Sequence, residues 1–271
     1  MNTSPLNLNY RCRGSGPPLI ILHGLFGSVV NWETIARYLS RYWTVFALDL
    51  RNHGDSPHSP HFGYEALVDD LKWFIDQHRI DQAILIGHSL GGKIVMAFAD
   101  RFPEKVEKLI VVDIAPKPYP AGHRHMLKAL IDFDLDRVKS LKEAIAGLTP
   151  AIPSLAIRQF LVKNLVRGKN DRYQWKINLD AIYRHYKELS QGPRLNNSCP
   201  KSALFIRGKA SEFVIDEDAD LIRRYFPNSR IVAIDNADHW LHVDAPEKTS
   251  ETIIDFLQTS LRPATPAKHV R

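Results

Sequence analysis

The feature that most constrains this chain is the pentapeptide Gly87-His88-Ser89-Leu90-Gly91. An apolar run at residues 83–86 precedes it, and a run of helical character at residues 93–99 follows it. This pattern predicts a strand, a tight turn and a helix, with the serine at the apex of the turn. Only very small side chains fit two residues before and two residues after such a serine, and both positions are glycine. The pattern indicates a strained serine with an exposed hydroxyl, and a glycine-rich turn without chemistry is the alternative interpretation.

Strand-like and helix-like segments alternate along most of the chain. Helical periodicity occurs near residues 32–39, 64–78, 216–226 and 246–261, and a short alternating stretch from Leu6 to Cys12 is typical of an edge strand. Short apolar runs, as expected of strands buried on both faces, occur at 19–22, 45–48, 83–86, 109–112, 203–206 and 231–234. This alternation predicts an α/β fold with a mostly parallel central sheet and helices on both faces.

The alternation is interrupted after the strand that ends at Asp113. Residues 117–200 contain no strand-like run, and helical periodicity recurs there around 122–131, 136–147, 154–166 and 178–189. We therefore expect a helical insertion at 117–200, called the lid segment below. The core would comprise residues 1–116 and 201–261, followed by a frayed tail at 262–271. The lid segment would lie over the carboxyl ends of the strands, where parallel sheets bind ligands.

Composition and charge exclude several classes of protein. The 271 residues are 44% hydrophobic and 24% charged, which is typical of a soluble globular protein. No signal peptide and no apolar run of about 18 residues is present, and Cys12 and Cys199 lack metal-ligand spacing. We expect a cytoplasmic protein with reduced thiols and no membrane span.

Positive charge is concentrated in the lid segment. This segment holds 15 Lys or Arg and 7 Asp or Glu, a net charge of 15 − 7 = +8, whereas the whole chain carries +6. No basic run is interleaved with stacking aromatic residues, so nucleic-acid binding is not expected. The alternatives are a solvated basic surface and a surface that steers anionic substrates.

Five motifs in a fixed order carry a family resemblance. The pentapeptide continues into Gly92-Lys93, and the other four motifs are His23-Gly24-Leu25-Phe26-Gly27-Ser28, Arg51-Asn52-His53-Gly54, Asp113-Ile114-Ala115-Pro116 and Ala237-Asp238-His239-Trp240. Over residues 19–261 the chain resembles the lidded α/β-hydrolases. It is most similar to their small bacterial esterase/thioesterase branch, which is related to mitochondrial abhydrolase-domain proteins. The resemblance implies the α/β-hydrolase fold, Ser89 as the nucleophile, and neither metal nor organic cofactor.

A serine hydroxyl is un-ionised near neutral pH, so Ser89 needs a base within hydrogen-bond reach. The resemblance implies His239, which lies beyond the strand at 231–234 and before the last helix. His242, three residues later, is the alternative base. His88 is expected to pack into the sheet with a hydrogen bond. Surface or loop positions are expected for the remaining candidates His53, His123 and His125.

The acid is where the sequence departs from the commonest family pattern. The usual aspartate follows the strand after the lid, and Ser211 occupies that position here. In the branch that this chain resembles, the aspartate that ends the preceding strand takes the role, which assigns Asp113. Glu212 is the alternative acid, and capping the turn into the lid segment is the alternative role of Asp113.

Attack on an acyl carbonyl creates an oxyanion that needs preorganised hydrogen-bond donors. The backbone N–H of Leu90, at the start of the helix after the serine, is one candidate donor. The second is expected from the loop at residues 23–26, with Leu25 as the first choice and Phe26 as the runner-up. Candidates to line the substrate pocket, with a purely structural core role as the alternative, are Phe26, Met126 and Trp240.

These residues predict a serine hydrolase that cleaves small-molecule carboxylic esters or acyl thioesters through an acyl-enzyme on Ser89. The basic lid segment suggests acyl-CoA or other anionic esters as substrates. Two alternatives stay open: a C–C bond hydrolase or lyase with the same triad, and a non-catalytic ligand-binding member of the fold. Acyl chain length, lid mobility and oligomeric state, whether monomer or weak dimer, are left open by the pattern.

Overall fold

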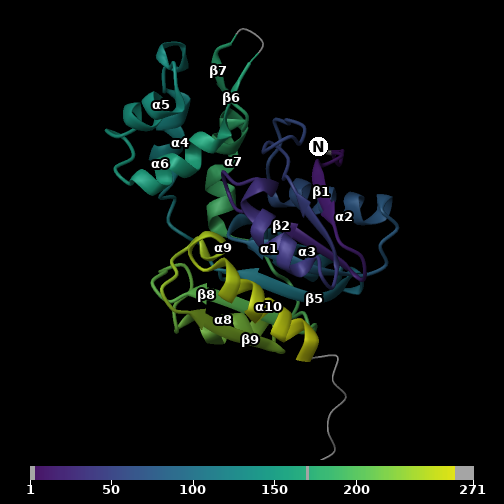
Figure 1. The fold of residues 1–271 in the computed structure, drawn as a ribbon. Helices are drawn as coiled ribbons and strands as arrows, with labels where there is room; N and C mark the ends of the chain where they lie inside the picture. The colour runs from purple at the N-terminus through teal and green to yellow at the C-terminus, as the bar shows by residue number, and fades with distance from the viewer. Residues whose placement is uncertain (1–3, 169–170, 260–271) are drawn as a thin grey trace, which may run out of the picture.

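Figure 1 shows the computed structural model, which describes residues 4–168 and 171–259. Seven strands form one sheet in the order β1-β3-β2-β4-β5-β8-β9. β1 is antiparallel to β3, and all other neighbours are parallel. The expected tail at 262–271 lies outside the described residues. The strands span Tyr10–Arg13 (β1), Pro18–Leu22 (β2), Thr44–Leu48 (β3), Ala83–His88 (β4), Val106–Val112 (β5), Ala203–Gly208 (β8) and Ser229–Ile234 (β9).

The central strands are apolar along their whole length because both faces of the sheet are covered. In β2, Ile20 and Leu22 belong to one buried cluster, whereas Leu19 and Ile21 belong to the cluster on the opposite face. This separation follows from the period of two in a strand, which turns successive side chains to opposite faces. The continuous apolar runs in the sequence therefore correspond to strands with a core on each side.

Helices form the outer layers of the core, as Figure 1 shows. One face of the sheet packs against α1 (Glu33–Leu39) and α10 (Pro246–Thr259), and the other packs against α2 (Tyr64–Gln77), α3 (Leu90–Arg101) and α8 (Asp218–Tyr225). Short helices at η1 (Val29–Trp32), η2 (Pro103–Lys105) and α9 (Leu241–Asp244) complete this part. The predicted α/β architecture, a mostly parallel sheet with helices on both faces, is confirmed.

The lid segment lies between β5 and β8 in the sequence and above the sheet in Figure 1. Its buried apolar residues, such as Met126, Leu130 and Ile182, belong to the same cluster as the α3 face of the sheet. Its helical elements are α4 (Arg124–Ile131), η3 (Leu135–Arg137), α5 (Leu141–Gly147), α6 (Leu155–Leu161), η4 (Val162–Asn164) and α7 (Leu179–Gln191).

The expectation that no strand occurs between residues 117 and 200 was wrong. Strands β6 (Leu165–Arg167) and β7 (Tyr173–Trp175) pair as an antiparallel hairpin. Each strand has three residues, which is too short for an alternating pattern to stand out in the sequence. Among the helices of the described residues, none is long and apolar enough to cross a membrane.

Candidate active site

Ser89 occupies a sharp turn between the end of β4 and the first residue of α3. Its backbone has φ 50° and ψ −114°, a conformation that is strained for a residue with a side chain. A Cβ atom on Gly87 would lie 2.2 Å from the Gly91 carbonyl oxygen, and one on Gly91 would lie 2.4 Å from the Leu22 carbonyl oxygen. The two glycines are therefore required by close backbone contacts, as the sequence pattern predicted.

His239 and Asp113 come from distant parts of the chain and meet beside this turn. The Nδ1 atom of His239 lies 2.8 Å from Oδ2 of Asp113, whose side chain is completely buried. The ring of His239 stacks on that of Phe213, with centroids 3.8 Å apart. A carboxylate can only accept at this contact, so Nδ1 carries the proton and Nε2 is left as a base.

The structure also defines what surrounds the Asp113 carboxylate. Oδ1 accepts a hydrogen bond of 3.0 Å from the Gly208 N–H, and Oδ2 accepts one from the Ser211 hydroxyl. Because β5 and β8 are neighbouring parallel strands, their carboxyl ends bring Asp113 and Ser211 together. Ser211, at the position of the usual acid, thus donates to Asp113. Glu212 is exposed and does not bond to His239, although it lines a nearby cavity.

Two histidines near His239, namely His88 and His242, are buried and neutral. His88 Nε2 lies 2.8 Å from the carbonyl oxygen of His239, so it donates to this carbonyl and supports the loop. Burial lowers the pKa of His88 well below its ordinary value. His242 stacks on Trp32 with ring centroids 5.0 Å apart, and burial lowers its pKa to about 3. His88 therefore has the packed, hydrogen-bonded position that the sequence predicted. No hydrogen bond joins His242, the alternative base, to a carboxylate among the described residues.

Two backbone N–H groups next to Ser89 have no acceptor among the described residues: those of Leu90 and Leu25. Leu25 lies in a tight turn closed by a 3.0 Å bond from the Gly27 N–H to the Gly24 carbonyl. The neighbouring Phe26 N–H donates to Nε2 of His53 at 3.3 Å. Of the two loop amides considered, Leu25 is therefore the one available to a ligand.

His53 was expected in a surface or loop position, and the surface placement was wrong. Its side chain is completely buried, and burial lowers its pKa to about 3. Nδ1 donates to the Arg51 carbonyl at 3.0 Å, which leaves Nε2 to accept from Phe26. The Phe26 carbonyl in turn accepts a 2.9 Å bond from Asn164 of the lid segment. The loop that holds Leu25 is thus fixed from the core and from the lid segment.

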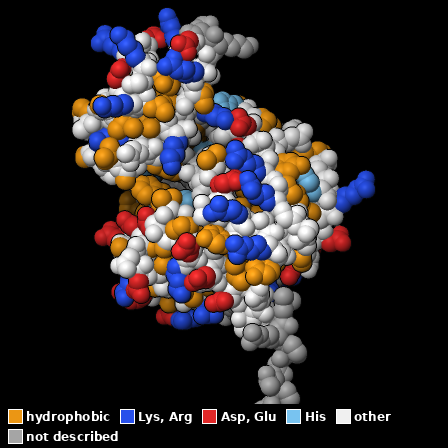
Figure 2. Space-filling model, viewed as in Figure 1, with side chains coloured by type: hydrophobic (Ala, Val, Ile, Leu, Met, Phe, Trp, Pro, Cys, Tyr) orange, Lys and Arg blue, Asp and Glu red, His pale blue; other side chains and the backbone are white. Residues whose placement is uncertain are grey.

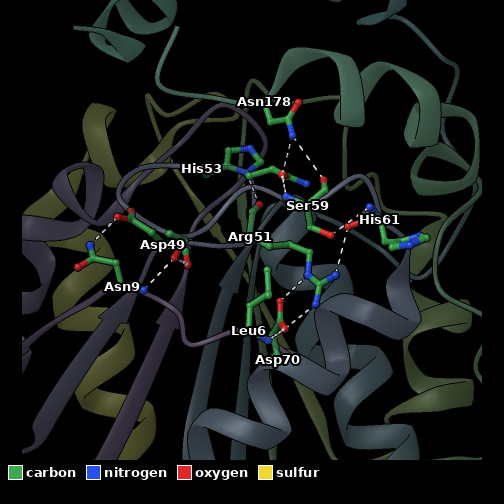
Figure 3. A network of polar contacts seen from close by, with 11 residues as sticks. Leu6, Asn9, Asp49, Arg51, His53, Ser59, His61, Asp70 and Asn178 are labelled. Carbon is green, nitrogen blue, oxygen red and sulfur yellow. Dashed lines mark hydrogen bonds and ion pairs between the residues drawn. The ribbon is translucent and has the colours of Figure 1, made fainter. Parts of the chain in front are cut away.

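Figure 3 shows how the Arg51–His53 loop is anchored. The Arg51 guanidinium makes two 2.6 Å hydrogen bonds to the buried Asp70 carboxylate. On the other side of the loop, Nδ2 of Asn178, in the lid segment, donates to the Asn52 side-chain oxygen at 3.0 Å. Residues 51–54 form one of the five sequence motifs, whereas the partners Asn164 and Asn178 lie outside these motifs.

Two cavities adjoin Ser89. One, of about 630 Å³, is lined by Leu25, Leu90 and Lys93 among others, and the second, of about 460 Å³, is lined by His239. Figure 2 shows hydrophobic side chains gathered in the recess between the lid segment and the core. The predicted pocket residues Phe26 and Trp240 line the smaller cavity, and Met126 lines both. The residues common to both cavities are Leu25, Ser89, His123, Met126, Ser154, Ile157 and Phe213.

Comparison with known proteins places the chain in a family. Residues 17–246 match the family model described as the alpha/beta hydrolase fold. The chain is 37% identical to the sn-1-specific diacylglycerol lipase ABHD11 of Danio rerio, over 94% of this chain and 84% of the relative. It is 32% identical to the esterase YbfF of Escherichia coli (strain K12), over 89% of this chain and 92% of the relative. A solved marine microorganism esterase is 39% identical, with a TM-score of 0.89 over 93% of this chain and 99% of that chain. The chain therefore belongs to the α/β-hydrolase fold family.

Proposed function

We propose that this protein is an ester hydrolase that forms an acyl-enzyme on Ser89, with His239 as the base and Asp113 as its orienting acid. One observation carries the proposal: a strained serine and a histidine paired with a buried carboxylate at 2.8 Å line the same cavity. Each group supplies what the next one needs, because a neutral hydroxyl requires a base and the base requires an orienter.

In this mechanism, Nε2 of His239 takes the Ser89 proton while the serine oxygen attacks the acyl carbonyl. The buried Asp113 carboxylate stabilises the positive charge that develops on the imidazole. His239 then donates the proton to the leaving oxygen or sulfur, and an alcohol or thiol departs. In the second half of the reaction, His239 takes a proton from a water molecule that attacks the acyl carbonyl. The histidine then returns the proton to the Ser89 oxygen as the acid departs.

The oxyanion of each tetrahedral intermediate would be held by the N–H groups of Leu25 and Leu90. Both lack a described protein acceptor and both residues line the larger cavity. Each such donor is worth about 3–4 kcal/mol of transition-state stabilisation in enzymes of this kind. The Phe26 N–H is bonded to His53 instead, so the structure favours Leu25 over this runner-up.

The two cavities suggest separate places for the two halves of the substrate. His239 must reach the leaving group to protonate it, and it lines the cavity of about 460 Å³. The leaving group would therefore occupy that cavity, and the acyl group would occupy the one of about 630 Å³. We infer that residues 117–200 act as a lid over a core formed by residues 1–116 and 201–261, since lid residues line both cavities.

The names of the relatives support the choice of an ester bond, because they include an esterase and a lipase. Thioesters, including acyl-CoA, are proposed from the net charge of 15 − 7 = +8 in the lid segment. Steady-state kinetics with an acyl-CoA and a neutral ester over a salt series tests this extension. Acyl-CoA turnover that does not respond to salt would contradict it.

A substrate panel tests the main proposal. It comprises p-nitrophenyl esters, acyl-CoAs and vinylogous diketones, each offered to the wild type and to Ser89→Ala. We expect ester hydrolysis by the wild type and a loss of at least a thousandfold in kcat in Ser89→Ala. Turnover of the diketones alone would favour a C–C bond hydrolase, and ester turnover that survives in Ser89→Ala would refute the role of Ser89.

A further inference from the structure

Lys93 lies in the wall of the larger cavity, one helical turn after Ser89. Its backbone N–H donates at 3.0 Å to the carbonyl of Ser89, the residue that immediately precedes α3. Side chains in a helix tilt toward its N-terminus, so the Lys93 side chain runs back toward the turn that carries Ser89. Both residues line the cavity of about 630 Å³.

The ammonium group of Lys93 is buried without a counter-charge. The residue is 5% exposed, and its Nζ atom donates to the Leu189 carbonyl at 3.0 Å. Nζ also lies 4.7 Å from the centroid of the Tyr119 ring, and no described carboxylate forms an ion pair with it. An ammonium has three donors, so this group retains hydrogen-bonding capacity. A buried cation in this state is stabilised by an anion that enters the cavity.

The remaining lining of this cavity favours an apolar chain between its two polar ends. Leu90, Ile114, Met126 and Ile152 contribute apolar side chains next to Ser89. One carboxylate, Glu212, also lines the cavity, but it is exposed to solvent, where its charge is screened. The cavity thus offers a nucleophile, apolar walls and a buried cation about one helical turn from the nucleophile.

We propose that Lys93 binds a terminal carboxylate on the acyl group, so that this protein prefers monoesters of short dicarboxylic acids. The inference rests on the proposed function, because it places the acyl group in the cavity that Lys93 lines. Ser89 and Lys93 line one cavity and are about one helical turn, roughly 5.4 Å, apart along the chain, so the acyl chain that joins the two groups would be short.

The test measures hydrolysis of monomethyl succinate, glutarate and adipate against the matched neutral dimethyl esters, by titration of released acid at constant pH. We expect the wild type to prefer at least one monoester. In Lys93→Met, the ratio of kcat/KM for monoester to kcat/KM for diester should fall about 10- to 100-fold, the usual range for a charge-assisted hydrogen bond. An unchanged ratio would overturn the proposal.

Two further variants separate charge from structure. Lys93→Gln keeps a donor for the Leu189 carbonyl but removes the charge, so it should lower the ratio as Lys93→Met does. Tyr64→Phe removes the other donor to this carbonyl, a bond of 2.7 Å, and leaves the ammonium in place. If Tyr64→Phe lowered the ratio equally, the effect would come from loosening the end of α7, and the proposal would be wrong.

The outcomes also distinguish this inference from the proposed function. If neither ester type is hydrolysed, or if Ser89→Ala hydrolyses them equally well, the proposed function fails. If the dimethyl esters are hydrolysed through Ser89 and the Lys93 variants leave the ratio unchanged, only the carboxylate-binding role fails.

A pH series gives an independent readout of the same role. Burial lowers the pKa of Lys93 to about 8, so the cation is lost as the pH rises through that value. Burial raises the pKa of both adjacent phenols, Tyr64 and Tyr119, which stay neutral in this range. The His123 pKa is lowered to about 4, so His123 is also neutral there. The monoester-to-diester ratio should fall above pH about 8, and a ratio that stays constant from pH 7 to pH 9.5 would contradict the role of the cation.

Discussion

Replacing Asp113 by asparagine tests the part of the site that the sequence left most open. The carboxylate accepts from His239 and Ser211 at one oxygen and from the Gly208 N–H at the other. An amide has only one acceptor oxygen. The Gly208 N–H can only donate, so it requires the amide oxygen. The Ser211 hydroxyl can accept instead of donating, and the histidine can change tautomer, so both can face an NH₂ group. The asparagine NH₂ group should therefore face His239.

This orientation places the histidine proton on Nε2, where it can no longer accept the Ser89 proton. The equivalent change in a serine protease lowers kcat about 10⁴-fold, and we expect a loss of about 10³- to 10⁴-fold here. This corresponds to about 4–5.5 kcal/mol in the activation free energy. Asparagine has nearly the same shape as aspartate, so the fold should be retained better than in Asp113→Ala, which leaves three buried donors unpaired.

The assay is kcat for a p-nitrophenyl ester at saturating concentration, with thermal unfolding recorded for each variant. Glu212→Gln is the matched control, because it neutralises the rival carboxylate, which does not bond to His239. It should retain most of kcat. If Asp113→Asn kept kcat within tenfold of the wild type, or if Glu212→Gln lost a thousandfold, the acid would not be Asp113.

Three further predictions concern the surrounding residues. His239→Gln should lower kcat about a thousandfold, whereas His242→Phe, which preserves the stacked ring, should keep most of it; the reverse result would transfer the base to His242. Asn164→Leu removes the 2.9 Å bond to the Phe26 carbonyl and should lower kcat about tenfold with little change in KM, and a change confined to KM would argue against a link to the oxyanion site. Burial lowers the His53 pKa from 6.5 to about 3, so the unfolded chain binds the extra proton in this window and stability falls as the pH decreases. His53→Gln should therefore reduce the pH slope of the unfolding free energy below pH 6 by up to about 1.4 kcal/mol per unit, and an unchanged slope would contradict a neutral buried His53.

The sequence was sufficient for the architecture because periodicity reports burial. The runs at Leu19–Leu22 and Leu109–Val112 lie in strands covered on both faces, and the glycines around Ser89 are required by atomic contacts. The hairpin β6–β7 was missed because three-residue strands are held by pairing with each other and by packing of the lid segment, which no local pattern records.

The polar support of the site was less predictable. Bonds such as Asn164 to Phe26 and Ser211 to Asp113 join residues about a hundred positions apart or more, so spacing along the chain contains no trace of them. The sequence held one signal for the structural role of His53, which is its position inside the motif at residues 51–54. A histidine on the surface without contacts would not be expected inside such a motif. Lys93 also stood in a motif, yet its lack of a counter-charge became visible only in the folded chain.

The central claim is that Ser89 carries the acyl group between the two halves of the reaction. It is tested most directly by acid-quenching the wild type during turnover of a p-nitrophenyl ester and measuring the mass of the intact protein and of its peptides. We predict one acyl adduct per chain, on the peptide that contains Ser89, and no adduct in Ser89→Ala. An adduct on another residue, or continued turnover by Ser89→Ala at the wild-type rate, would contradict the account.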